Sequence, residues 1–204
     1  MWGAVMLEHE REKKCQTFFY HLDRSLFLPK TIAEKAKLDC PLPIGFGQTI
    51  SQPSLVLQMT LALQLTPDCK VLEVGTGSGY QTAFLAEFAK EVYTVERFEL
   101  LSQRAKMVLD ELGYRNIHFK VGDGSLGWEE HAPYQRIMVT AAAIRWPESL
   151  ISQLDLGGRM VIPIGTREVQ DLQLVQKDVA GKVYGTSLER VRFVELVGDY
   201  GWQP

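Results

Sequence analysis

Residues 70–96 read KVLEVGTGSGYQTAFLAEFAKEVYTVE, and this stretch decides the fold. It opens with the short apolar segment 70–75, passes through three alternating glycines, and then shows helical periodicity over 80–90. Residues 91–96 return to the composition of a strand. A strand, a glycine turn, a helix and a second strand form a βαβ unit, the building block of a parallel sheet.

The same alternation continues toward the C-terminus. We expect further strands at 116–124, 135–143 and 158–165, and helices at 98–113 and 147–154. After residue 165 the pattern changes, and QDLQLVQKD (170–178) and VRFVELV (191–197) predict strands on either side of Ala180-Gly181 in an antiparallel finish. The sequence thus predicts the α/β class, with a doubly wound, mostly parallel, Rossmann-like sheet and antiparallel C-terminal strands.

An N-terminal helical segment precedes this core. Residues 8–38 look helical around a turn at 28–30, residues 41–53 read as neither helix nor strand, and 54–65 predict a helix. We expect a single domain over 1–204, made of N-terminal helices and a covering loop (1–66), an α/β core (67–165) and a β-rich end (166–204).

Composition and charge argue against several classes of function. The 204 residues carry a net charge of −3 without a long basic run, which speaks against a nucleic-acid partner. The sequence has no apolar run of membrane-spanning length and no signal-peptide pattern at its N-terminus. The three cysteines lack a CxxC spacing and the four histidines lack metal-ligand spacing, so we expect reduced thiols, a cytoplasmic protein and no metal.

The glycine loop points to a cofactor. Gly75, Gly77 and Gly79 permit a tight turn and close approach of a ligand to the backbone. The dinucleotide pattern GxGxxG fails, because its third glycine would fall on Tyr80 or Thr82, and no GK[ST] follows. The GxGxG pattern, with Glu73 two residues ahead of it, resembles the first motif of class I methyltransferases, which bind S-adenosylmethionine.

Two further acids suit that cofactor. Glu96 ends the second strand, where its carboxylate can accept hydrogen bonds from both ribose hydroxyls; the alternative is a surface acid at a strand end. Asp123 follows the third strand in GDG and can receive the adenine amino group; the alternative is a plain Asp-Gly turn.

The broken segment before the core carries a closer resemblance. PLPIGFGQTIS (41–51), VLEVGTGSGYQTAFLA, VYTVER, GDGSLGW, APYQRIMVTAAA, GGRMVIPIG and VRFVELVG resemble, in order and spacing, the protein-L-isoaspartate O-methyltransferase family over about residues 40–200. The resemblance implies methyl transfer from S-adenosylmethionine to the free carboxylate of L-isoaspartyl residues in damaged proteins and peptides. S-adenosylhomocysteine would be the second product, and the methyl ester would collapse to a succinimide in protein repair.

The resemblance also implies the site residues. The active-site serine is Ser51, with Thr49 beside it; an isoaspartyl carboxylate is already ionised, so these hydroxyls position it and no strong base is needed. The alternative for Ser51 is a cap of the helix 54–65. The expected cofactor contacts are Gly45, Gly47, Gln48, Glu73, Gly75, Thr76, Gly77, Gly79, Glu96, Arg97, Asp123, Gly124 and Gln170. The expected substrate pocket consists of Ile50, Ser54, Val139, Thr140, Ala141 and Ala142.

Two positions depart from the family pattern. Ser54 stands where histidine is usual and Ile144 where proline is usual, and we expect both at the mouth of the pocket. They leave open a different acceptor, such as another carboxylate, a modified peptide or a small molecule, or a cofactor-binding module without catalysis. The chain lacks the [DN]PP[YF] motif of amine-methylating relatives, which favours an oxygen acceptor. We expect a monomer.

Overall fold

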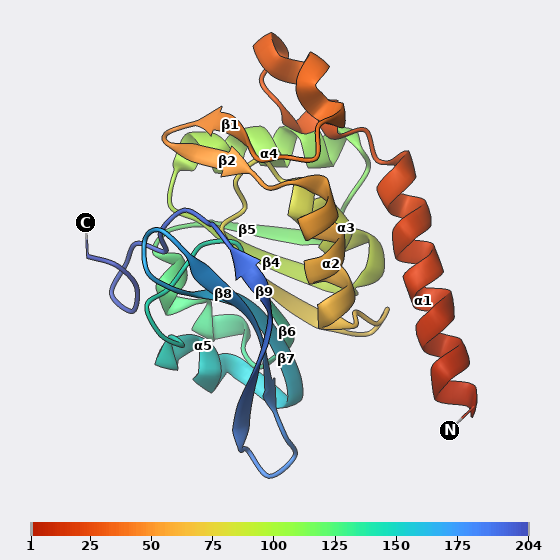
Figure 1. The fold of residues 1–204 in the computed structure, drawn as a ribbon, viewed down its shortest axis with the longest axis vertical. Helices are drawn as coiled ribbons and strands as arrows, with labels where there is room; N and C mark the ends of the chain where they lie inside the picture. Colours follow the sequence, from red (N-terminus) through yellow and green to blue (C-terminus); the bar gives the residue numbers. More distant parts are fainter. Residues whose placement is uncertain (1, 204) are drawn as a thin grey trace.

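The computed structural model describes the backbone of residues 2–203 and the side chains of residues 9–203. Its centre is a seven-stranded sheet in the order β5-β4-β3-β6-β7-β8-β9 (Figure 1). The strands are β3 (Lys70–Val74), β4 (Glu91–Glu96), β5 (Ile117–Val121), β6 (Tyr134–Val139), β7 (Leu154–Gly165), β8 (Gln170–Lys177) and β9 (Val183–Val191). β3 to β7 are parallel, and β8 and β9 are antiparallel additions. The predicted doubly wound sheet with an antiparallel finish is confirmed.

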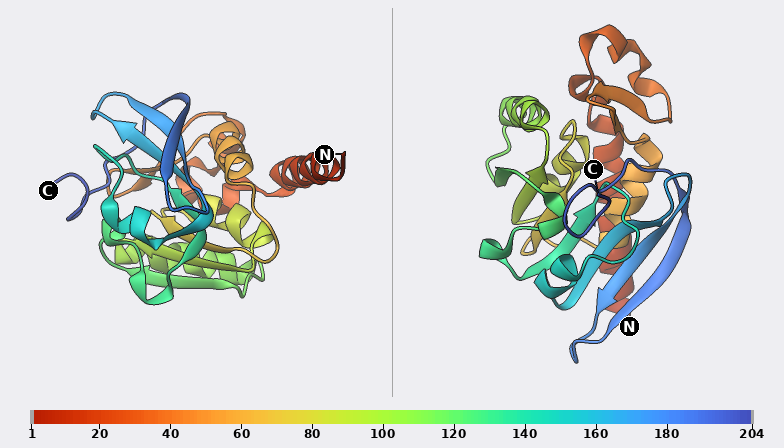
Figure 2. Two further views of the ribbon diagram at one scale, coloured as in Figure 1. Left: turned by 90° about the horizontal axis from the view of Figure 1, so that it is seen from below. Right: turned by 90° about the vertical axis from the view of Figure 1, so that its left-hand side faces the viewer.

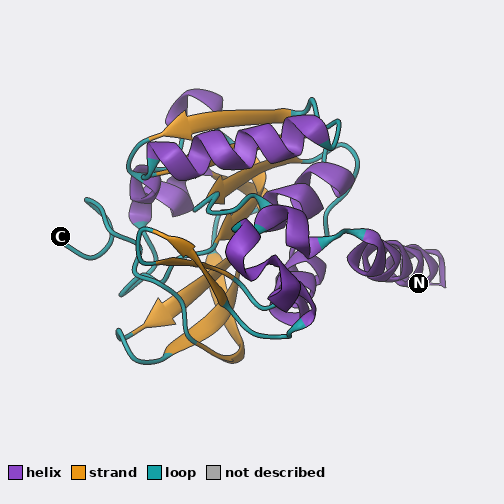
Figure 3. Cartoon of the chain, turned by 90° about the horizontal axis from the view of Figure 1, so that it is seen from above, coloured by secondary structure: helices purple, strands orange, loops and turns teal. Residues whose placement is uncertain are grey.

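Helices cover both faces of the sheet. The α-helices are α1 (Trp2–His21), α2 (Pro53–Leu63), α3 (Tyr80–Phe88), α4 (Glu99–Glu111) and α5 (Glu148–Gln153). The 3₁₀-helices are η1 (Arg24–Phe27), η2 (Lys30–Lys37), η3 (Gly124–Leu126) and η4 (Glu129–His131). Seen from above, the helices flank the twisted strands while α1 projects to one side (Figure 3). Within residues 2–203, none of these helices combines the length and the apolar character needed to cross a membrane.

The central strand β3 shows why the sheet forms. Val71 belongs to an apolar cluster with α2 and α3, whereas Leu72 and Val74 belong to a cluster on the α5 face. Alternate side chains of a strand point to opposite faces, so a strand covered on both sides reads as a continuous apolar run. Glu73 shares the α3 face with Val71 and accepts a hydrogen bond from Thr82 of α3.

The strand order reverses next to β3. β3 pairs with β4 on one side and with β6 on the other, so the crossovers leave β3 in opposite directions. Open α/β sheets bind ligands at the carboxyl ends of the strands flanking such a reversal. The glycine loop and residues 96, 97 and 140 stand at these ends.

The segment 41–53 is more regular than predicted. β1 (Leu42–Gly45) and β2 (Gln48–Ile50) form an antiparallel hairpin, closed by Phe46 at a positive φ of 54°. Leu42, Ile44 and Ile50 are buried, whereas Pro43 is exposed. A two-stranded ribbon tolerates proline because it consists only of edges, and this is why the proline-rich sequence did not reveal the strands.

The prediction of a strand at 191–197 was wrong. The strand after Ala180-Gly181 is β9, which ends at Val191, and together β8 and β9 form a hairpin whose tip projects beyond the sheet (Figure 2). Residues 192–197 instead cross to the end of β6, where Ala142 donates to the carbonyl of Val194 at 2.7 Å. Their apolar side chains pack against the end of β6 instead of extending the ladder, while β9 is polar and half exposed and lacks the usual strand signal.

The N-terminal helical segment is divided. The predicted helical stretch 8–38 consists of α1, which ends at His21, and the two 3₁₀-helices η1 and η2. The C-terminal end of α1 packs on the core through Phe18, whose ring meets Phe84 edge to face at 5.0 Å. The beginning of α1 lies away from the sheet (Figures 1 and 2).

Candidate active site

A cleft opens at the carboxyl ends of β3, β4 and β6. It encloses about 760 Å³ of space free of protein atoms, part of it continuous with solvent. Its walls come from the β1–β2 hairpin, the glycine loop (75–79), the ends of β4 and β6, and residues 192–197, the C-terminal segment. The lining residues named by the sequence analysis are Gln48, Thr49, Ile50, Ser51, Gly75, Thr76, Gly77, Glu96, Arg97, Gly124, Thr140 and Ala141.

The glycine loop forms the floor of the cleft. Gly75, Gly77 and Gly79 have positive φ values of 95°, 54° and 87°. A Cβ on Gly75 would clash with the hydroxyl of Thr140, and one on Gly79 would lie 3.1 Å from the Cβ of Ala105 in α4. The two glycines therefore serve different purposes: Gly75 makes room in the cleft, whereas Gly79 begins α3 and lets it pack on α4.

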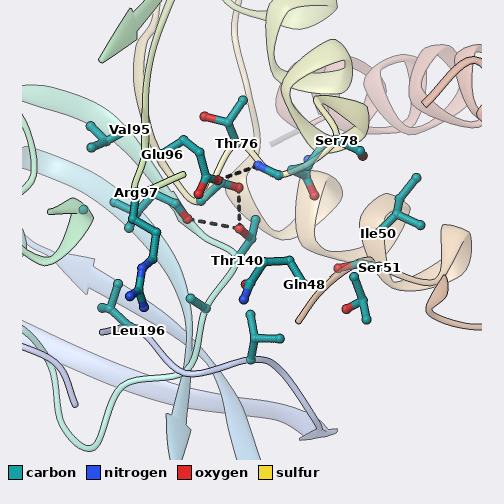
Figure 4. A pocket seen from close by; sticks show the side chains of 18 of the residues that line it. Gln48, Ile50, Ser51, Thr76, Ser78, Val95, Glu96, Arg97, Thr140 and Leu196 are labelled. Carbon is teal, nitrogen blue, oxygen red and sulfur yellow. Dashed lines mark hydrogen bonds between the residues drawn. The ribbon is translucent and has the colours of Figure 1, made fainter. Parts of the chain in front are cut away.

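Glu96 points into the cleft from the last position of β4 (Figure 4). Its Oε2 accepts a hydrogen bond from the amide of Gly77 at 2.8 Å, and its Oε1 accepts one from the amide of Phe98 at 3.0 Å. The side chain is 5% exposed. A carboxylate has about four acceptor positions, so two amides leave room for two more donors, as a ribose would supply.

Glu73 lies beneath the cleft and does not line it. It is 0% exposed, and its Oε2 accepts hydrogen bonds from Thr82 at 2.6 Å and Thr94 at 2.7 Å. Thr94 in turn contacts the hydroxyl of Thr76 at 2.6 Å, so the carboxyl supports the glycine loop from below. Burial raises the pKa of Glu73 to about 8, with a further increase from Glu96, against the two threonine hydrogen bonds.

The acceptor side of the cleft carries two hydroxyls, Thr49 and Ser51. Figure 4 shows Ser51 beside Ile50, across the cleft from Glu96. The alternative role of Ser51 as a helix cap is wrong, because Gln52 precedes the first residue of α2, Pro53. Among residues 9–203 no hydrogen-bond partner occupies either hydroxyl, so both remain available to a ligand.

The sequence analysis missed the residue that holds this wall in place. Arg24 is 4% exposed, and its guanidinium donates to the carbonyls of Ala36 and Leu38 at 3.2 and 2.9 Å. It also donates to those of Cys40 and Ser51 at 2.8 and 3.0 Å. One side chain thus ties η2 and the start of the hairpin to the backbone of Ser51. The sequence gives no local signal for this role, because Arg24 stands between the polar residues Asp23 and Ser25.

The segment after β6 contributes part of what was expected. Thr140 lines the cleft, and its hydroxyl donates to the carbonyl of Gly75 at 2.6 Å, which joins β6 to the glycine loop. Ala141 also lines the cleft. Val139 and Ala142 do not, because Val139 is packed in the core and Ala142 pairs with the C-terminal segment.

Other expected site residues have structural partners outside the cleft. Asp123 does not line the cleft; it accepts from the amides of Ser125 and Asp199, both at 2.8 Å, which leaves one further acceptor position on each carboxylate oxygen. Gln170 is buried and accepts from the amide of Phe193 at 2.8 Å. Gly45 is the last residue of β1, and Gly47 lines a neighbouring groove.

The two departures from the family pattern also lie outside the cleft lining. Ser54 is exposed and donates its hydroxyl to Asp39 at 2.7 Å, while its amide donates to the other oxygen of Asp39 at 2.9 Å. Ile144 is exposed beyond the end of β6. Neither side chain reaches the space between Ser51 and Glu96.

The C-terminal segment closes the cleft in a way that was not predicted. Val194, Glu195, Leu196 and Val197 line it, as do Tyr80 and Gln81 at the start of α3. Burial raises the pKa of Tyr80 to about 12, so its phenol stays protonated at neutral pH. Among the side chains of residues 9–203 there is no cluster of histidine, cysteine and acidic groups that could bind a metal.

A reversed parallel sheet with a glycine loop after its first strand and a carboxylate at the end of its second defines a class I methyltransferase. The comparisons with known proteins narrow the class. A family model described as protein-L-isoaspartate(D-aspartate) O-methyltransferase matches residues 6–201. The chain therefore belongs to the protein-L-isoaspartate (D-aspartate) O-methyltransferase family.

Individual relatives agree with this assignment. A protein-L-isoaspartate O-methyltransferase of Dictyoglomus turgidum is 56% identical over 88% of this chain and 81% of its own. That of Dictyoglomus thermophilum is 51% identical over 95% of this chain and 87% of its own. A solved protein-L-isoaspartate O-methyltransferase superposes with a TM-score of 0.80 at 28% identity, over 95% of this chain and 67% of that one.

Proposed function

We propose that this enzyme transfers the methyl group of S-adenosylmethionine to the free carboxylate of L-isoaspartyl residues in damaged proteins and peptides. The observation that carries the proposal is a single cleft with a glycine cradle and Glu96 on one side and the hydroxyls of Thr49 and Ser51 on the other. When bound, S-adenosylmethionine supplies a methyl group activated by a sulfonium ion.

One half of the cleft would hold the cofactor. The backbone of Gly75 and Gly77 leaves room for the cofactor, and Glu96 accepts the ribose hydroxyls at its two remaining positions. Gln48, Thr76, Arg97 and Gly124 complete this half of the cleft. With S-adenosylmethionine held there, these residues would present its methyl group to a carboxylate oxygen, and the transfer would leave the bonding pair on sulfur.

Thr49 and Ser51 orient the accepting carboxylate. That carboxylate is ionised at neutral pH, so no side chain has to remove a proton before it attacks. Opposite charges on nucleophile and sulfonium disappear in the transfer, and a site that excludes water favours this neutralisation. Ile50, Val56 and Leu196 supply apolar walls for that purpose. Positioning by the two hydroxyls is therefore the main contribution of the chain.

A pair of peptides tests the function. They are identical except for L-isoaspartate in one and L-aspartate in the other, and methyl transfer is measured with labelled S-adenosylmethionine. We expect a base-labile label only on the isoaspartyl peptide, and at least a tenfold lower rate with Ser51→Ala. Ser152→Ala, which removes an exposed hydroxyl from α5, is the matched control and keeps full activity. Label on neither peptide, with S-adenosylhomocysteine still bound by calorimetry, would falsify the proposal.

Three further features belong to this proposal. The enzyme acts as a single-domain monomer in the cytoplasm, and its partners are its protein and peptide substrates. Its cysteines Cys15, Cys40 and Cys69 are free thiols in the structure, which suits a reducing compartment. Size-exclusion chromatography with light scattering tests the monomer.

A further inference from the structure

A second groove joins the mouth of the cleft. It encloses about 1110 Å³ of protein-free space open to solvent and runs between the β1–β2 hairpin and the C-terminal segment. Gln48, Thr49 and Arg97 border both the cleft and the groove, as do Val194, Glu195 and Val197. A peptide whose carboxylate reaches Ser51 therefore has this groove as a path for its neighbouring residues.

The groove is positively charged. Its lining includes Arg97, Arg167 and Arg192 but only one acid, Glu195, which leaves an excess of two positive charges. The whole chain has a net charge of −3, so the positive charge of the groove is opposite in sign to that of the protein as a whole. An excess of one sign along a cleft raises the local concentration of ligands of the opposite sign.

Two of the three arginines have no acidic partner. Arg167 pairs with Glu195, Nε to Oε1 at 2.8 Å, and its guanidinium packs 4.9 Å from the ring centroid of Trp202. Arg97 lies over the ring of Phe98, and Figure 4 shows its side chain reaching toward Leu196. Among residues 9–203 no carboxylate lies within ion-pair distance of Arg97 or Arg192. Their planar donors remain available for a carboxylate, which they can bind with two parallel hydrogen bonds.

We propose that this groove binds the residues flanking the isoaspartyl residue and selects peptides that carry aspartate or glutamate there. The inference rests on the proposed methyl transfer and adds its substrate preference. Arg192, with no acidic partner, contributes most, and Arg167 contributes less because Glu195 already neutralises it. The flanking charges are unchanged by methylation, so the preference acts on binding and shows in KM more than in kcat.

Three isoaspartyl peptides test the preference. They differ only in the residues on both sides of the isoaspartyl position, which are glutamate, glutamine or lysine. We expect kcat/KM to fall in that order, with about a fivefold difference between the glutamate and lysine peptides at low ionic strength, falling below about twofold at 0.5 M salt. Arg192→Gln reduces the difference, and Arg192→Glu abolishes or reverses it.

Lys182→Glu is the matched control. It makes the same change of charge in the exposed loop between β8 and β9, at the tip of the hairpin and away from the groove. We expect this variant to keep the wild-type order of peptides. Binding of S-adenosylhomocysteine to each Arg192 variant shows that the variant is folded.

The outcomes separate this inference from the proposed function. Equal kcat/KM for the glutamate and lysine peptides would overturn the proposed preference for acidic flanking residues, and so would an equal change of that preference in Lys182→Glu and Arg192→Glu. Either result would leave the proposed isoaspartyl methylation intact. Failure to methylate any isoaspartyl peptide would overturn both.

Discussion

Replacing Glu73 with glutamine should change how stability depends on pH. The carboxyl is completely buried, and its pKa rises from 4.5 to about 8 on folding. Because this carboxyl binds its proton more tightly in the folded state, raising the pH ionises it first in the unfolded chain. That ionisation stabilises the unfolded chain and lowers the free energy of unfolding. Its full stability is present below pH 4.5 and is lost as the pH rises through 8.

The structure sets the size of the effect. Each pKa unit corresponds to about 1.4 kcal/mol, so at pH 7 the wild-type protein loses about 3 kcal/mol relative to pH 4.5, and above pH 8 it loses about 5 kcal/mol. Glutamine cannot ionise but has the same shape. Its carbonyl can accept from Thr82 and Thr94, and its amide group takes the place of Oε1, which has no hydrogen-bond partner in the wild type.

The assay is urea denaturation of both proteins at pH 5, 7 and 9. The free energy of unfolding of Glu73→Gln minus that of the wild type should increase by about 2.5 kcal/mol from pH 5 to 7 and further by pH 9. Glu111→Gln removes an exposed carboxylate from α4 and serves as the control, with a constant difference. A constant difference for Glu73→Gln as well would refute the argument that burial holds this carboxyl protonated.

Three other substitutions test the walls of the cleft. Arg24→Lys should lower kcat at least tenfold, while the affinity for S-adenosylhomocysteine stays within about twofold of wild type. The substitution releases the backbone of Ser51, and a displacement of about 1 Å can cost a hundredfold in rate. An equal loss of kcat and of affinity would show that Arg24 has a merely structural role. Gly75→Ala should weaken cofactor binding more than tenfold, measured by calorimetry, and lower the free energy of unfolding by about 1–3 kcal/mol. The added Cβ would clash with Thr140, and residue 75 has a positive φ. Wild-type affinity would contradict the role of the glycine loop in binding the cofactor. Glu96→Gln should weaken cofactor binding by about tenfold or more, because hydrogen bonds to a charged acceptor are worth about 1.5–3 kcal/mol; unchanged affinity would place the ribose elsewhere.

The alternating core of the fold was predictable from sequence because its signals are local. A buried parallel strand needs a continuous apolar run and a covering helix needs its own period, and both appear within 70–96. The β1–β2 hairpin and β9 were missed for the opposite reason. Prolines, glycines and polar residues are tolerated at sheet edges, where the usual strand pattern is not required.

The site shows the same division between local and distant information. The place of Glu96 in the cleft could be predicted because this residue ends a strand, where its side chain reaches past the edge of the sheet. Glu73 comes one residue before its strand ends, so its side chain points to the face under α3. Asp123 accepts a hydrogen bond from the amide of Asp199, 76 residues further along the chain, and no local pattern reveals such a partner.

The outer edge of β9, the last strand of the sheet, bears on how this enzyme meets its substrate proteins. Damaged proteins expose extended segments, and an unpaired strand edge is a template on which such segments can aggregate. β9 offers a poor template: its pairing with β8 slips between Leu172 and Gln173, Gly185 interrupts it, and Glu189 and Arg190 place charges along it. The outer edge of β9 is therefore poorly suited to pairing with an extended segment of a damaged substrate protein.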